Sequence, residues 1–218
     1  DPSLRQSFSS IQVPGHINLQ GIGTPQYTNT AYPWDGSEQL KPPALPNNIP
    51  VGQYATNFSI PDKWLDSGCS LRIRFDGVEP AFRLWCNGRY VGYSEDSFSP
   101  AEFDITPFVH AGGNDVAVEV YRWASGSWLE DQDFWRFWGI FRSVWLVCLP
   151  AHRISDVQVY ADMDGSLSVT AATAGLVDTV SLVLRDTAGE LAASGSIAVT
   201  GGEAQLQVCV TRPSLWSA

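Results

Sequence analysis

The sequence predicts an all-β protein built from β-sandwiches, and three observations support that fold class. Apolar and polar residues alternate with period two in several segments, most clearly in Leu71–Phe75. Only Asn87-Gly88 separates two apolar segments, and this dipeptide readily takes the positive φ values of a type I′ hairpin turn. Short strand-like segments follow at near-regular spacing with no helix of ordinary length, which is typical of sandwiches.

The size and composition of the chain limit the number of domains and the kinds of partner. The chain has 218 residues, enough for one large sandwich or two smaller domains, and its 44% hydrophobic and 17% charged content is ordinary for a globular protein. A net charge of −10 argues against nucleic acid and anionic membranes as partners, which leaves sugars, cations and other proteins. No apolar run approaches the roughly 20 residues that cross a bilayer. We expect a cytoplasmic protein, with a secreted or periplasmic one, its signal removed, as the alternative.

The expected elements of the first part begin after a proline-rich opening. Eight of the fourteen prolines occur up to Pro50, so this stretch should be extended, loop-forming chain. Strands are then expected at Gln53–Ile60 and Leu71–Phe75, with a single helical turn at Pro61–Leu65 between them.

A hairpin follows, formed by Ala81–Cys86 and Arg89–Tyr93. Thr106-Pro107 should begin another short turn, because proline suits the first position of a helix. Strands are also expected at Val116–Tyr121 and Ser143–Cys148, the second of them buried on both faces.

The composition changes near Pro150. Eight of the nine tryptophans precede this residue, and a run of small and β-branched residues follows it. Two domains, residues 1–149 and 150–218, are the simplest interpretation. The second should contain five short strands, at Val157–Tyr160, Leu167–Thr170, Val180–Arg185, Ile197–Thr200 and Ala204–Val210.

The chemistry is concentrated in Trp128–Trp138, where three acids lie among five aromatic residues. If this stretch is extended, Asp131 and Asp133 share one face about 7 Å apart. Aromatic rings can cover the apolar face of a sugar while carboxylates accept its hydroxyl hydrogens. The alternatives are a surface loop whose acids pair with Arg136 and Arg142, or one oxygen ligand of a cation completed elsewhere. A catalytic acid pair is disfavoured, because neighbours on one strand rarely face each other across a substrate.

A second polar and aromatic loop, Gly23–Trp34, contains Asn29. The Asn29 amide could bind a sugar hydroxyl, or it could satisfy loop backbone, which is the commoner role of asparagine. Glu95-Asp96 is a weaker candidate, and Asp162–Gly165 fits a plain hairpin turn. The cysteines show no metal-binding spacing and the three histidines are scattered, so no zinc or histidine-based centre is expected.

These two loops resemble motifs of bacterial β-galactosidases of glycoside hydrolase family 2. Pro25–Pro33 is similar to the P-x-Y-x-N-x-x-Y-P motif of that family, and Leu129–Trp135 to its L-E-D-Q-D segment. Further matches follow in family order over about residues 10–148. They are Phe75–Val78, Leu84–Arg89, Val91–Ser94, Glu102–Asp104 and Gly139–Arg142.

The resemblance implies a jelly-roll, galactose-binding-like sandwich over residues 1–149, then an immunoglobulin-like sandwich over residues 150–218. It implies that Asn29 reaches the galactose site, and that Asp133 touches galactose and ligates sodium. The two catalytic glutamates lie in a (β/α)₈ barrel to which nothing here corresponds, so no catalytic residue is expected. Sodium and magnesium are expected in the full-length enzyme, and no cofactor in this part alone.

Two departures from the family pattern stand out. Some relatives place an acid for a further divalent ion in an R-W-S-D-G segment, which here is Arg122-Trp-Ala-Ser-Gly126, without the acid. The chain stops after Pro213-Ser-Leu-Trp-Ser, which is similar to the P-x-L-W-S motif inside the second domain. We therefore expect that domain to be incomplete at its C-terminus.

The resulting hypothesis is a non-catalytic, inactive N-terminal portion of a retaining β-galactosidase that hydrolyses terminal β-D-galactosides. It would complete the galactose pocket, dock on the barrel and belong to a full-length homo-oligomer. One alternative is a free-standing carbohydrate-binding module, which should bind galactose or lactose alone. Others are the same region of a family 2 β-glucuronidase or β-mannosidase, and a purely structural assembly domain.

Overall fold

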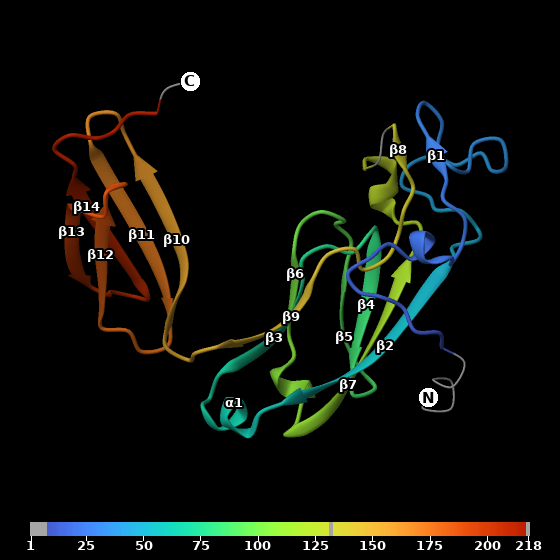
Figure 1. The fold of residues 1–218 in the computed structure, drawn as a ribbon, viewed down its shortest axis with the longest axis horizontal. Helices are drawn as coiled ribbons and strands as arrows, with labels where there is room; N and C mark the ends of the chain where they lie inside the picture. The colour runs from blue at the N-terminus through green and yellow to red at the C-terminus, as the bar shows by residue number, and fades with distance from the viewer. Residues whose placement is uncertain (1–7, 131–132, 217–218) are drawn as a thin grey trace. The chain divides into compact units, whose positions relative to one another are not determined.

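The computed structural model describes residues 8–130 and 133–216 (Figure 1). The chain divides into two compact units between Cys148 and Leu149. The predicted all-β class is confirmed, since the described part is built of antiparallel sheets and contains one five-residue α-helix, α1 (Asp62–Asp66). No helix in this part of the chain is long and apolar enough to span a membrane.

The larger sheet of the first unit has four strands in the order β2-β7-β4-β5. The β4–β5 hairpin confirms the predicted turn, because Asn87 and Gly88 have φ values of 49° and 74°. Both turn residues are therefore left-handed, as type I′ requires. The four strands are β2 (Val51–Ile60), β7 (Gly112–Tyr121), β4 (Ala81–Cys86) and β5 (Arg89–Ser94).

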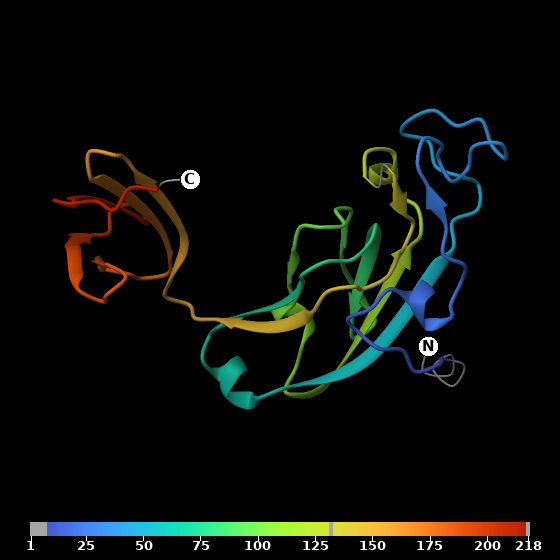
Figure 2. The same ribbon diagram turned by 45° about the horizontal axis from the view of Figure 1, so that its top comes forward.

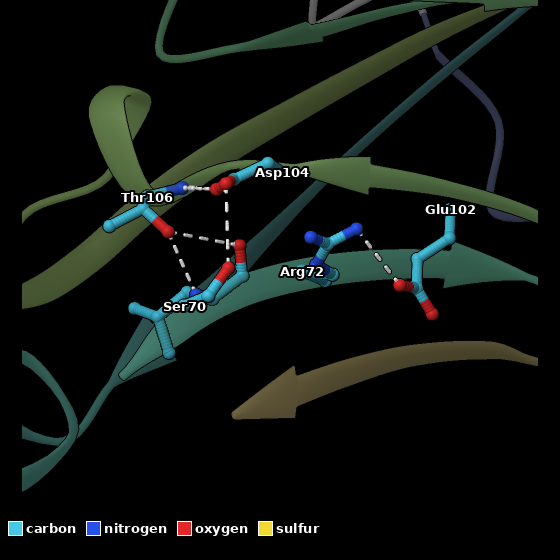
Figure 3. Close-up of polar contacts among 6 residues, drawn as sticks. Ser70, Arg72, Glu102, Asp104 and Thr106 are labelled. Atoms are coloured by element: carbon cyan, nitrogen blue, oxygen red, sulfur yellow. Dashed lines mark hydrogen bonds and ion pairs between the residues drawn. The ribbon is translucent and has the colours of Figure 1, made fainter. Parts of the chain in front are cut away.

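The smaller sheet has three strands in the order β6-β3-β9, which are β6 (Ala101–Asp104), β3 (Ser70–Phe75) and β9 (Val144–Leu149). Polar contacts fasten β3 to β6 on the solvent side (Figure 3). Arg72 and Glu102 form an ion pair at 3.2 Å, and the amide of Leu71 donates to the hydroxyl of Thr106 at 2.8 Å. Thr106 lies in η3 (Thr106–Phe108), which confirms the predicted short turn.

The two sheets of the first unit enclose one apolar core, so they form a β-sandwich. Leu71, Ile73 and Phe75 alternate inward along β3 and are nearly inaccessible to solvent, as the period-two pattern predicted. Phe75 meets Phe82 of the opposite sheet with ring centroids 4.7 Å apart. Each such buried side chain contributes about 1.5–3 kcal/mol to stability.

One strand is present as predicted, but its predicted burial is wrong. The segment Ser143–Cys148, expected to be buried on both faces, forms the edge strand β9, and Trp145 is 54% exposed. Its indole N–H donates to Asp76 at 2.7 Å, while Val144 and Leu146 pack on the core. An antiparallel edge strand can solvate one face, which an apolar composition alone does not reveal.

The second unit contains five strands in two sheets, β10-β11-β14 and β12-β13. Four of them lie where they were expected, but the fourth in chain order, β13, begins at Leu191 and overlaps the expected Ile197–Thr200 only at its end. The Asp162–Gly165 turn joins β10 to β11 as predicted. The small apolar core of the second unit is formed by Ala171, Val180, Ala204 and Leu206. The strands are β10 (Arg153–Ala161), β11 (Ser166–Ala174), β12 (Thr179–Arg185), β13 (Leu191–Ala198) and β14 (Glu203–Cys209).

Candidate functional site

Two very short strands build the site at one end of the first unit. Strand β1 (Tyr27–Thr28) pairs antiparallel with β8 (Phe134–Trp135), as Figures 1 and 2 show. Tyr27 lies opposite Trp135, and Thr28 lies opposite Phe134. Asn29 directly follows Thr28 and Asp133 directly precedes Phe134, so both predicted residues lie at the same end of this ladder.

Asp133 has an unusual backbone, with a φ of 56°. Left-handed conformations cost non-glycine residues about 1–2 kcal/mol, although aspartate tolerates them better than most. The Tyr27 hydroxyl donates a short hydrogen bond to Asp133 Oδ1. This bond raises the pKa of Tyr27 and engages Oδ1 of Asp133, while Oδ2 accepts no hydrogen bond from the residues that the structure describes.

Asn29 is exposed and partly engaged with its own loop. Its Oδ1 accepts from the Thr30 amide at 2.6 Å and from the Thr30 hydroxyl at 3.4 Å. The loop-backbone role considered from the sequence is therefore present. The Nδ2 group forms no hydrogen bond within the described ranges, and it leaves two donors for a ligand.

The side chain of Arg136 connects the site to the body of the sandwich. Only 3% of Arg136 is exposed, and its Nε donates to the Thr28 hydroxyl at 3.1 Å. Its Nη1 donates to the carbonyls of Ser127 and Glu130, each at 3.4 Å. A buried guanidinium is tolerated only when it is hydrogen-bonded, so these bonds position both strands of the ladder.

Pairing of the acids with Arg136 and Arg142 was one alternative considered from the sequence, but the Glu130 carboxylate is bound by Ser97 instead. This carboxylate accepts from the hydroxyl of Ser97 at 2.5 Å and from the amide of Ser97 at 3.3 Å. Arg142 instead donates to the carbonyl of Phe98 at 2.8 Å. Asp131 lies outside the described residues, so the shared face expected for it and Asp133 stays a prediction.

The aromatic residues near the site divide into two groups. Trp34, Trp123 and Trp128 are buried against one another, with Trp34 and Trp128 centroids 4.7 Å apart. Tyr27 and Trp135 are about half exposed beside Asp133, with centroids 5.6 Å apart. Of these five rings, only Tyr27 and Trp135 are exposed enough to contact a ligand.

No group of three or more histidine, cysteine, aspartate or glutamate side chains that could hold a metal occurs in residues 8–130 and 133–216. In the segment where some relatives carry an acid, the Ser125 hydroxyl donates to Glu95, as does the Gly126 amide at 2.7 Å. Burial raises the pKa of Glu95, but the hydrogen bonds from Ser125, Tyr93 and Gly126 outweigh it and hold the pKa below its usual range. The sequence did not predict this interaction, because residues 95 and 125 come close to each other only in the folded chain.

The chain matches the family model described as glycosyl hydrolases family 2, sugar binding domain, over residues 2–150. It is 47% identical to a β-galactosidase of Halalkalibacterium halodurans over 97% of this chain and 22% of that protein. It is 52% identical to a β-galactosidase of Priestia megaterium over 76% of this chain and 16% of that protein. The chain thus spans about a fifth of the length of these curated relatives.

Solved structures share the fold at lower identity. The β-glucuronidase of Bifidobacterium dentium complexed with coumarin-3-O-glucuronide matches with a TM-score of 0.65 at 19% identity, over 76% of this chain and 34% of that one. A β-glycosidase from Bacteroides vulgatus matches with a TM-score of 0.60 at 22% identity, over 77% of this chain and 22% of that one. At such identities the likeness concerns the fold alone.

Proposed function

The chain belongs to glycosyl hydrolase family 2, as its motifs predicted, and we propose that it is the non-catalytic N-terminal part of a β-galactosidase acting on terminal β-D-galactosides. The observation that carries the proposal is the β1–β8 ladder, which brings Asn29 and Asp133 to one end from distant parts of the sequence. A sugar site needs such convergent polar groups beside exposed rings.

Asn29 and Asp133 bind and orient the galactosyl group in this proposal. The free oxygen of Asp133 accepts a hydroxyl hydrogen, and the Asn29 amide donates to a second hydroxyl. The exposed rings of Tyr27 and Trp135 exclude water and contact the C–H face of the sugar. Fixing the sugar in this way lowers the activation barrier of cleavage without either residue transferring a proton.

The two carboxylates that cleave the glycosidic bond belong, in the proposal, to a (β/α)₈ barrel outside this chain. Glycosidases need an acid and a nucleophile or base flanking the scissile bond, about 5–9 Å apart. The jelly-roll and immunoglobulin-like identities of the two units belong to the same proposal, and the two-sheet sandwich of the first unit supports the former.

Asp133 is also the proposed sodium ligand. One carboxylate supplies at most two of the several oxygens that a hard cation takes, and Tyr27 already occupies Oδ1. The other ligands would therefore come from the barrel. Magnesium of the intact enzyme would bind elsewhere, since the Glu95 carboxylate is engaged by its own neighbours.

Docking to that barrel is part of the same proposal, and the exposed apolar side chains of β8 support it. Phe134 and Trp135 are each nearly half exposed. Adjacent exposed aromatic residues of this kind are typical of interaction surfaces. The cytoplasmic location and the homo-oligomeric state of the intact enzyme stay predictions.

Substrate selectivity tests the proposal. The intact protein that contains this chain should hydrolyse a nitrophenyl β-D-galactoside in preference to the matching β-D-glucuronide and β-D-mannoside. The chain alone should hydrolyse none of the three. Preference for the glucuronide or mannoside would contradict the proposal in favour of another family 2 specificity, and hydrolysis by the chain alone would contradict its non-catalytic role.

A further inference from the structure

A second depression, separate from the β1–β8 ladder, lies over the outer face of the β2-β7-β4-β5 sheet. Its volume is about 370 Å³, within the range of small-molecule sites. None of the residues that line it belongs to the Asn29–Asp133 site. They include Arg83, Tyr90, Tyr93, Glu95, Tyr121 and Trp123.

A β-bulge creates the aromatic wall of this depression. Leu84 pairs with Gly92 and the next residue, Trp85, pairs with Tyr90, so Val91 is the extra residue. In a regular strand, residues 90 and 93 would face opposite sides of the sheet. The bulge turns both tyrosines outward, leaving Tyr90 53% and Tyr93 46% exposed.

On the inner side of β5, close packing against the core restricts the backbone at the bulge. A Cβ added to Gly92 would lie 2.6 Å from the Phe103 ring, and Val91 packs on the core. The core contact of Gly92 therefore keeps the bulge in place. Two exposed tyrosine rings are held at the rim by packing beneath them.

Arg83 provides hydrogen-bond donors within the depression. Its guanidinium carbon lies 5.5 Å from the Tyr121 ring centroid, and Arg83 is the cross-strand neighbour of Tyr93 and Glu119. It forms no hydrogen bond or ion pair with any of the described residues. All five of its N–H donors therefore remain for water or a ligand.

Two of the tyrosine hydroxyls at the depression already have partners. The Tyr93 hydroxyl donates to Glu95 at 2.6 Å, and the Tyr121 hydroxyl donates to Glu119 at 3.0 Å. Both phenolic oxygens can still accept a hydrogen from a ligand hydroxyl. The two carboxylates and the net charge of −10 disfavour phosphates and uronic acids.

We propose that this depression is a second carbohydrate-binding site, which takes a neutral pyranoside of mono- or disaccharide size. The tyrosine rings cover the C–H face of the sugar, and Arg83 donates to two neighbouring hydroxyl oxygens. The phenolic oxygens accept hydroxyl hydrogens at the edge.

The test is an NMR titration of the chain with methyl β-D-galactopyranoside and with lactose, up to about 50 mM. Shifts should centre on amides of residues 83–93 and 121–125, with a dissociation constant in the millimolar range. Arg83→Ala and Tyr90→Ala should each weaken binding about tenfold or more. Tyr160→Ala, which truncates a 68% exposed tyrosine of the second unit, should leave it unchanged.

The Asp133→Asn variant separates this inference from the galactose pocket. Binding that survives Asp133→Asn and is lost in Arg83→Ala or Tyr90→Ala supports the second site, whatever the intact enzyme hydrolyses. The inference is overturned by an absence of shifts at the highest sugar concentration, or by shifts centred on residues 27–29 and 133–135. Unchanged binding in both Arg83→Ala and Tyr90→Ala overturns it as well.

Discussion

The hydroxyl of Tyr27 donates to the carboxylate of Asp133 across 106 positions of the sequence. This bond joins the two loops that carry the family motifs, at the point where Asp133 takes a left-handed backbone conformation. A single phenol thus holds a strained residue and orients its carboxylate. Tyr27 belongs to the P-x-Y-x-N motif, so the structure gives its tyrosine a positioning role beside Asn29.

Replacing Tyr27 by phenylalanine should weaken galactoside use in the intact enzyme. The ring stays while the hydrogen bond to Asp133 is lost, so the carboxylate is less well oriented, and kcat/KM should fall about fivefold. Tyr160→Phe, at an exposed tyrosine with no such bond, is the matched control. Equal kcat/KM in the two variants would show that the Tyr27 bond does not position Asp133.

Alanine at Gly92 should destabilise the first unit. The added methyl group would overlap the Phe103 ring, and overpacking of this kind costs about 1–3 kcal/mol. Gly113→Ala is the control, because a Cβ there meets nothing within 4 Å, and its effect should stay within about 0.5 kcal/mol. Urea unfolding followed by tryptophan fluorescence measures both, and similar effects from the two variants would contradict the packing described for β5.

The stability of the first unit should fall in acid partly through Asp104. Burial raises the pKa of Asp104, but hydrogen bonds from Thr106, the charge of Arg72 and a bond from Ser70 hold it below its ordinary 3.8. A lowered pKa in the folded state stabilises the fold above pH 3.8, and this contribution is lost as the pH falls through the lowered value.

Asp104→Asn should therefore flatten the fall of the melting temperature below pH 3.8, since an amide cannot titrate. Asp62→Asn, on the exposed surface of α1, is the control and should follow the unmodified chain. A curve for Asp104→Asn that is parallel to the curve of the unmodified chain would mean that the contacts in Figure 3 do not favour the ionised carboxylate.

Local sequence patterns predicted the strands well where side chains alternate or a turn needs special backbone. Leu71–Phe75 and the Asn87-Gly88 hairpin are examples, because both depend on neighbours in the chain. The beginning of β13 was missed, since Leu191–Ser196 consists mainly of small residues without apolar alternation. The bulge at Val91 was also missed, because it depends on packing between Gly92 and Phe103.

The candidate site could be predicted in part. The motifs indicated Asn29 and Asp133, but neither periodicity nor composition shows that β1 pairs with β8, since that register joins distant segments. The roles of Tyr27 and Arg136 follow only from that pairing. Within the Trp128–Trp138 segment that was considered as a sugar platform, Trp128 instead packs against Trp34.

The proposed binding of the galactosyl group by Asp133 can be tested by measuring kcat/KM of the Asp133→Asn intact enzyme for a nitrophenyl β-D-galactoside. Asparagine tolerates the left-handed backbone, so the substitution keeps the fold while it removes the charge. We expect kcat/KM to fall about a hundredfold or more and to depend less on sodium, whereas kcat/KM of Asp164→Asn, in the β10–β11 turn, should stay unchanged. A kcat/KM for Asp133→Asn within about twofold of the unmodified enzyme, with sodium dependence intact, would show that Asp133 does not bind the galactosyl group.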